Sequence, residues 1–408
     1  MSIGKTGPFF VAMALGASIV SAGAQEADPG AGYEPLGIRA GSFVVLPSLT
    51  TSAVYSDNIF RTESNTEDDL ILTVQPQVLV ESAWSRHALN LHAGVQSRFY
   101  DSNSSEDHTN WRVGADGRLD ITRDTNVVGE VEYAELHEER GEPLALATAA
   151  EPTPFSALSG SIELNQRFNR MTGTLGASYS QLDFDTVPAT VGPPINNDGR
   201  DREEYEQRLR LGYDVSPDMN VFVEGRLNQV RYDLQPPAVP NSRDSEGYAV
   251  QGGVTFAITR LVSGEVAVGY LEQEYDSPAF RNVSGLAYNA DISWSMTPLT
   301  TVTFGAGSSV DESTSVGVGG RLSQYARVGV DHELMRNVQL SGALRFQNDD
   351  YEGTTQNEDY LDAGVGVRYL MNRNVSLRLG YDYGTRESNV AGRDYTENRV
   401  GLSLTLQR

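Results

Sequence analysis

The sequence contains no cysteine and a single lysine, Lys5, and it lacks any long apolar run. Without cysteine the protein has no disulfide and no thiolate metal ligand, which suits an oxidising compartment. No stretch approaches the roughly eighteen consecutive apolar residues of a membrane-spanning helix. A bilayer-spanning protein of this kind would therefore have to be a closed β-barrel, in which all backbone hydrogen bonds run between strands.

The N-terminus has the pattern of a secretory signal. Lys5 supplies a positive start, residues 8–20 are apolar or small, and Ala22-Gly23-Ala24 is an A-x-A-like cleavage site. We therefore predict a signal peptide over residues 1–24, cleaved near Ala24. A short periplasmic lead-in over 25–42 and one barrel domain over 43–408 follow it.

From residue 43 onward the apolar residues recur with a period of two, as in residues 338–346. Such alternation is typical of strands with one apolar and one wet face. Short turns alternate with longer polar loops, whereas soluble sandwiches or propellers have strands of about five or six residues. We predict an all-β fold: a transmembrane antiparallel up-and-down barrel of about 18 strands (16–18), with short periplasmic turns and long extracellular loops. The predicted strands are 43–55, 70–82, 86–100, 110–122, 126–137, 155–168, 171–183, 203–215, 220–232, 246–258, 261–272, 284–296, 300–310, 319–334, 337–347, 359–370, 374–383 and 395–406.

The negative charge gathers on one rim. The nine long-loop regions with their flanks hold 36 acidic and 9 basic residues, whereas the rest of the predicted mature chain holds 19 and 21. An acidic extracellular rim would face lipopolysaccharide and bind bridging divalent cations, or it would merely keep the loops solvated. No loop has the spacing of a calcium motif, so no metal site and no cofactor is predicted. Nucleic-acid binding is disfavoured, because the sequence has no basic stripe.

The strand face opposite the apolar one carries charges of both signs. With about eighteen strands the lumen is wide enough to hold water unless a loop plugs it. These side chains would form structural cross-strand pairs, or a ladder that orients a polar solute as arginine does for carboxylates. The predicted pore-lining residues are Arg98, Arg112, Asp116, Arg118, Glu130, Glu132, Arg167, Arg208, Arg210, Glu224, Arg226, Arg327, Arg345, Arg368 and Arg378.

Aromatic residues near the strand ends fit the girdles of membrane barrels. The five histidines are scattered, and neither a paired histidine metal motif nor a Gly-x-Ser-x-Gly elbow occurs. We therefore predict no enzyme, and His92 is the one lumenal histidine to check. The predicted girdle residues are Tyr55, Phe99, Trp111, Tyr133, Tyr179, Tyr205, Tyr248, Tyr270, Trp294, Phe346, Tyr369 and Tyr381.

The start of the barrel resembles the putative β-barrel porin type 2 family. The resemblance rests on Pro35-Leu36-Gly37-Ile38-Arg39-Ala40-Gly41-Ser42-Phe43, on Pro47-Ser48-Leu49 and on Tyr55-Ser56-Asp57-Asn58-Ile59-Phe60-Arg61. It implies an outer-membrane channel, with several members associated with exopolysaccharide or capsule export, and it supplies no catalytic residues. The chain departs from many barrels by ending Leu404-Thr405-Leu406-Gln407-Arg408, without a terminal aromatic for the insertion machinery. For Asp57 and Asn58 turn formation is the default expectation.

Three functions therefore remain open. The first is a porin-like channel for polar solutes or exported saccharide, and the second is a non-conducting surface barrel acting through acidic loops. The third is a lipid-hydrolysing barrel, because a triad built from distant strands is not detected by sequence motifs. The expected partners are outer-membrane lipid and lipopolysaccharide, the barrel-insertion machinery and polysaccharide-export components. The sequence predicts neither the solute nor the oligomeric state.

Overall fold

The computed structural model describes residues 32–236, 239, 241–315 and 317–408. The predicted signal peptide and the first part of the predicted lead-in lie outside these residues. No helix within the described residues is long and apolar enough to cross a membrane. The elements there are β1 (Ile38–Ala40), β2 (Phe43–Ser56), β3 (Asp69–Ser82), β4 (Ala88–Tyr100), the 3-10 turn η1 (Ser104–Glu106), β5 (His108–Asp120), β6 (Thr125–His137), β7 (Pro154–Phe168), β8 (Met171–Phe184), the 3-10 turn η2 (Asp198–Arg200), β9 (Arg202–Ser216), β10 (Met219–Tyr232), β11 (Ser245–Phe256), β12 (Val262–Tyr275), β13 (Val283–Thr297), β14 (Thr300–Glu312), β15 (Gly320–Met335), β16 (Val338–Tyr351), β17 (Asn357–Asn372), β18 (Val375–Ser388) and β19 (Tyr395–Gln407).

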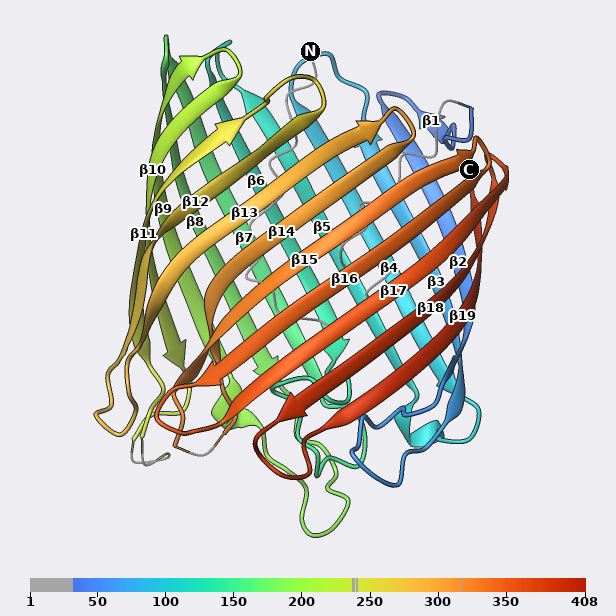
Figure 1. Ribbon diagram of the computed structural model, residues 1–408, viewed down its shortest axis with the longest axis vertical. Coiled ribbons are helices and arrows are strands. Elements are labelled where there is room, and N and C mark those ends of the chain that lie inside the picture. Colours follow the sequence, from blue (N-terminus) through green and yellow to red (C-terminus); the bar gives the residue numbers. More distant parts are fainter. Residues whose placement is uncertain (1–31, 237–238, 240, 316) are drawn as a thin grey trace.

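The strands β2 to β19 form a closed barrel (Figure 1). Each strand pairs antiparallel with its neighbours in sequence, and β19 returns to pair with β2 between Arg399↔Ser56 and Gln407↔Ser48. These eighteen strands, among the described residues, are 12 to 16 residues long, enough to cross a bilayer at a tilt. The predicted fold class and the count of eighteen strands are confirmed.

The two ends of the barrel differ in their connections. Two-residue turns such as Asn169-Arg170 join strands at one end, and loops of up to 17 residues join them at the other. The C-terminal end of β19 lies at the short-turn end, and the long loops lie at the opposite end (Figure 1). This alternation of connections is the one that the sequence predicted.

The strand faces alternate as the sequence pattern requires. On β12, Val266, Val268 and Tyr270 are 37 to 55% exposed, whereas the intervening Ala267 and the following Leu271 are at most 7% exposed. An exposed apolar face around a closed sheet is suited to lipid, and the covered face lines the interior. Each strand therefore divides its residues between the bilayer and the lumen.

Aromatic pairs lie on the lipid-facing side close to the long-loop end. The ring centroids of Trp111 and Tyr133 are 5.4 Å apart, and those of Tyr179 and Tyr205 are 5.1 Å apart. The hydroxyl of Tyr205 donates to Glu203 (2.7 Å). Rings with a polar tip that reaches a carboxylate fit the boundary between hydrocarbon and head groups.

The short strand β1 completes the barrel wall where the last strand ends. The pairing of β19 with β2 stops at Ser48, and β1 then pairs with β2 between Ile38↔Val45 and Ala40↔Phe43. Gly41, at φ +63°, makes the turn between β1 and β2. The start of β2 is thereby kept from being an unpaired edge. The predicted lead-in thus contains one strand of the sheet.

Candidate functional site

The lumen is the candidate functional site, because the charged strand faces meet there. All fifteen predicted pore-lining residues alternate with the exposed apolar residues of their strands. On β9, for example, Leu209 and Leu211 are at least 50% exposed, whereas the side chains of Arg208 and Arg210 are 10% and 19% exposed. The structure therefore places these residues on the inner face.

Four of the fifteen residues come together in one network on the wall of β7 to β12. Arg208 binds Glu163 on β7 (2.7 Å), and Arg210 binds Glu265 on β12 (2.6 Å). Glu224 on β10 lies between the arginines, 3.7 Å from Arg210 and 3.3 Å from Arg226. Strands that are not neighbours are thereby linked across the inner surface, so that the charges are held in fixed positions.

A glycine makes the link between Arg208 and Glu163 possible. Arg208 on β9 and Glu163 on β7 reach one another across β8, which presents Gly176 between them. A Cβ on Gly176 would lie 3.6 Å from Glu163 Cγ and 3.7 Å from Arg208 Cβ, so that anything longer than a methyl group would enter the path of the ion pair.

The other predicted residues are dispersed around the wall, most of them with partners on nearby strands or loops. Arg327 lies opposite Arg345, and Arg368 opposite Arg378, in the register of their strands. Arg112 lies opposite Ala134. The lumenal histidine His92 contacts Glu132 (2.9 Å), a structural pairing between strands. The further contacts are Arg98 with Glu139, Asp116 with Asn90 (2.9 Å), Arg118 with Asp120 (2.8 Å), Glu130 with Ser161 (3.1 Å), Arg167 with Asp214, Arg327 with Asp291 (3.0 Å), Arg345 with Gln347 (2.6 Å) and Arg378 with Ser341 (3.4 Å).

The loop between β6 and β7, residues 138–153 (the inward loop), turns inward across the lumen, where it contacts Arg98 of β4 and Arg386 of β18. The sequence predicted one of the acidic surface loops here and did not indicate this role. Its residues 143–150, Pro-Leu-Ala-Leu-Ala-Thr-Ala-Ala, are apolar for an exposed loop, and this is the signal that the sequence offers.

Charged side chains hold the first residues of the inward loop. Glu138 pairs with Arg200, which η2 provides, and Glu139 pairs with Arg98 of β4. Arg140 binds Glu106 of η1 through two hydrogen bonds of 2.8 and 2.6 Å. Glu106 is only 2% exposed, so removing one partner of this pair would cost about 3–5 kcal/mol.

Two further arginines bind the backbone of the inward loop. Arg61 donates to the carbonyl oxygen of Arg140 (2.8 Å), and Arg386 of β18 donates to that of Gly141 (3.1 Å). Four consecutive residues are thus anchored to parts of the chain that are far apart in sequence. Burial opposes the ionisation of Glu139, but the guanidinium groups of Arg98 and Arg61 outweigh it and hold the pKa of this carboxyl below its ordinary value.

The inward loop also packs on the loop between β8 and β9, residues 185–201. Ala149 pairs with Ala189 as an isolated bridge, and Val187 is fully buried. Beneath them Phe155 and Phe184 stack with centroids 5.1 Å apart, and the guanidinium of Arg200 lies 4.0 Å from the Phe184 ring. The interior therefore has an apolar cluster of its own, which fixes both loops over one side of the lumen.

One carboxyl of the second loop is perturbed. Burial, together with the carboxylates of Asp183 and Asp198, raises the pKa of Asp201 to about 6, against the hydrogen bond that it accepts from the Phe184 amide. This group therefore changes charge close to neutral pH.

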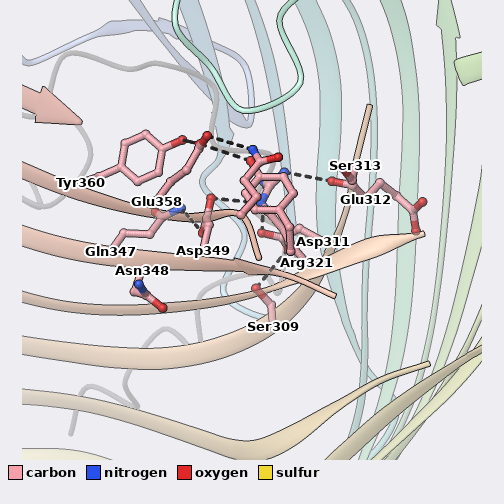
Figure 2. A network of polar contacts seen from close by, with 12 residues as sticks. Ser309, Asp311, Glu312, Ser313, Arg321, Gln347, Asn348, Asp349, Glu358 and Tyr360 are labelled. Atoms are coloured by element: carbon pink, nitrogen blue, oxygen red, sulfur yellow. Dashed lines mark hydrogen bonds and ion pairs between the residues drawn. The ribbon is translucent and has the colours of Figure 1, made fainter. Parts of the chain in front are cut away.

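A second polar network braces the long-loop end on β14 to β16, around Arg321 (Figure 2). Its guanidinium lies 3.0 Å from Asp349 and 3.5 Å from Asp311, and donates to the Glu312 carbonyl oxygen (2.9 Å). Asp349 is fully buried. The network thus links β14, β15 and β16 and stiffens the rim.

The first and last strands are clasped at the same end by residues 56–61. Asp57 accepts hydrogen bonds from the backbone and side-chain amides of Asn398, both 2.7 Å. Asn58 donates to the Thr396 carbonyl oxygen (2.9 Å), and Arg61 binds Glu397 (2.9 Å). Asp57 and Asn58 therefore close the barrel, beyond the local turn that the sequence led us to expect.

Among the described residues no group of three or more histidine, aspartate or glutamate side chains is arranged to hold a metal ion. The carboxylates and arginines of the lumen instead bind one another. What this arrangement offers chemically is a lumen with a fixed pattern of charge, narrowed by an anchored loop.

Comparison with known proteins finds one matching family and several similar solved structures. The family model described as Putative beta-barrel porin 2 matches residues 30–408. No curated protein matches the chain. Similar solved structures include OpdO of Pseudomonas aeruginosa (14% identity, 90% of this chain and 97% of that chain, TM-score 0.47), OccAB4 of Acinetobacter baumannii (11%, 89% and 98%, 0.46) and the copper transporter OprC (10%, 91% and 81%, 0.48).

The barrel itself rests on the strand pairings described above, and the family match covers all of them. The resemblance found at the start of the sequence is thereby confirmed. The chain belongs to the Putative beta-barrel porin 2 family and is a porin-like β-barrel channel protein of the outer membrane.

Proposed function

We propose that the barrel passes small polar solutes, saccharides among them, through a water-filled lumen that the inward loop narrows. The observation that carries the proposal is the anchoring of residues 138–141 by charged side chains of β4, β18, η1, η2 and the β2–β3 loop. A barrel of eighteen strands is wide enough for an aqueous path. A loop fixed inside it sets the size limit without closing the whole cross-section.

The fifteen inner-face residues listed above would line this path. Their charges need water or partners, and the fixed pairs on β7 to β12 leave both signs in defined positions. A solute with several hydroxyl groups would exchange hydrogen bonds along such a wall. An exported polysaccharide would pass along the wall through the same hydrogen bonds, because it carries the same hydroxyl groups on a longer chain. Polysaccharide-export components would then be partners at the periplasmic end.

Single-channel recording in planar bilayers tests the proposal. Arg386→Gln removes one anchor of the inward loop, and Arg373→Gln makes the same change of charge at the exposed turn that precedes the same strand, away from the loop and from the inner wall. We expect steady steps for the natural protein and for Arg373→Gln. Arg386→Gln should give larger and noisier steps, because the loop is held less firmly.

The absence of conductance steps in the natural protein would overturn the channel. Equal recordings from the two variants would overturn the role of the loop. A competing function, a non-conducting surface barrel, is favoured by the apolar cluster that fixes two loops over one side of the lumen. In that case the acidic loops would bind lipopolysaccharide through divalent cations, and chelation of these cations would release the lipopolysaccharide from the loops.

Delivery to the outer membrane would follow the route predicted from the sequence. We infer removal of residues 1–24 after Ala24 and insertion by the barrel-insertion machinery. The mass of the protein purified from outer membranes tests the cleavage site, since the mature chain should begin at Gln25.

A further inference from the structure

A cavity of about 370 Å³ lies between the tip of the inward loop and the inner wall of β9 to β15. Glu142, Pro143 and Leu144 of the loop form one side of it. This volume suits one or two rings of a sugar, and a site of this kind buries most of such a ligand. The cavity is therefore a candidate binding site within the proposed channel.

The wall of the cavity presents amide groups to hydrogen-bond a ligand. Gln251 and Gln273 are at most 5% exposed, and the buried Oδ1 atom of Asn228 accepts no hydrogen bond from any described residue. A Cβ on Gly247 would lie 2.2 Å from that atom and 1.9 Å from Gln273 Oε1. Glycine thus leaves both amides room at this position. A buried acceptor without a partner is costly, and a ligand hydroxyl would satisfy it.

Aromatic rings supply an apolar surface in the same cavity. Phe222 is 5% exposed, and the guanidinium of Arg210 lies 3.4 Å from the centroid of its ring. Tyr288 and Tyr325 line the cavity from β13 and β15. Sugars have C–H faces as well as hydroxyl groups, so that a wall combining rings with amides matches their chemistry.

Charge decides which sugars fit. Among the described residues, nine acidic residues and three arginines line the cavity. Arg200, Arg208 and Arg210 lie next to the lining and pair with Glu138, Glu163, Glu224 and Glu265, which leaves the carboxylates in excess. A negative cavity repels carboxylate ligands and favours neutral or cationic ones.

We propose that this cavity binds a saccharide unit without negative charge, an amino sugar best of all, and that it rejects uronic acids. The inference rests on the proposed channel and deepens it by assigning the solute class. Glu206, which lines the cavity beside Asn228 in the strand register, is the residue that would receive the amino group.

Sugar-induced interruption of the ion current through the full-length barrel tests the inference, with glucosamine, glucose and glucuronate as probes. One charge-assisted hydrogen bond is worth about 1.5–3 kcal/mol, or roughly tenfold or more in affinity. We expect glucosamine to interrupt the current at about tenfold lower concentration than glucose, and glucuronate to be the weakest.

Two variants and a matched control assign the site. Glu206→Gln should abolish the preference for glucosamine over glucose, and Asn228→Ala should weaken the binding of both sugars. Asp382→Asn removes a carboxylate from β18 on another part of the wall, and it should leave the preference unchanged. Interruption by glucuronate as strong as by glucosamine, or an unchanged preference in Glu206→Gln, would overturn the inference.

The sugar site and the proposed channel can be refuted independently of one another. If the barrel gives no conductance steps, calorimetric titration of the detergent-solubilised barrel with the same three sugars still decides the site. The same order of affinities in that titration would retain the cavity as a sugar site, and the absence of binding would overturn it.

Discussion

Replacement of Asn58 by alanine tests how the barrel is closed. This side chain is 1% exposed and makes three hydrogen bonds: to the carbonyl oxygens of Thr62 and Thr396, both 2.9 Å, and from the Thr62 amide, 3.1 Å. A hydrogen bond contributes about 1 kcal/mol net, and an abandoned buried partner costs more. We therefore expect the free energy of unfolding to fall by about 2–4 kcal/mol.

The assay is denaturant unfolding of the barrel refolded into lipid vesicles, followed by tryptophan fluorescence and by the electrophoretic shift of the folded form. Asn374→Ala is the matched control, because Asn374 also donates to a carbonyl oxygen of the last strand, that of Gln407 (2.8 Å), but at the exposed turn end. We expect the control to lose less than about 1 kcal/mol. If the two variants were equally stable, the hydrogen bonds of Asn58 would not contribute to the closure of the barrel between its first and last strands.

Two further predictions concern the loops and pH. The pKa of Glu139 lies below its ordinary value. Its pairing with Arg98 therefore stabilises the inward loop fully at any pH above the ordinary pKa of a glutamate. This stabilisation is lost only as the pH falls through the lowered pKa. Conductance should therefore stay constant from neutral pH down to about 5 and change under more acidic conditions. The pKa of Asp201 is raised to about 6, so its stabilising contribution is present at acidic pH and is lost as the pH rises through that value. Asp201→Asn should consequently abolish the loss of protection against hydrogen exchange of residues 185–201 between pH 5 and 8, measured relative to the intrinsic exchange rate at each pH, and an unchanged loss of protection would contradict the assignment.

The architecture followed from the sequence because its signal is local. Alternation such as that of Val266, Val268 and Tyr270 is repeated in strand after strand, and each repeat fixes both the element and its two faces. The alternation of short turns and long loops then fixed the polarity of the barrel. The three-residue strand β1 was not predicted, because it is too short to show a period.

The site was only partly predictable, because its contacts join residues that are far apart in the chain. Arg386 and Gly141 meet across 245 positions, and Asp57 and Asn398 across 341. No periodicity or spacing encodes such pairs before the barrel is closed. The inner-face residues could be listed from alternation, but which of them meet, as Arg208 and Glu163 do, depends on strand register and on Gly176 between them.

The central claim is that the inward loop narrows a water-filled lumen. Replacing residues 143–149 by two glycines and comparing single-channel conductance with that of the natural protein tests it most directly, because the tip is removed while residues 138–141 keep their anchors. If the loop narrows the lumen, both proteins should give conductance steps, and the shortened protein should give the larger ones. Equal conductance, or a natural protein that gives no steps while the shortened one is equally silent, would contradict it.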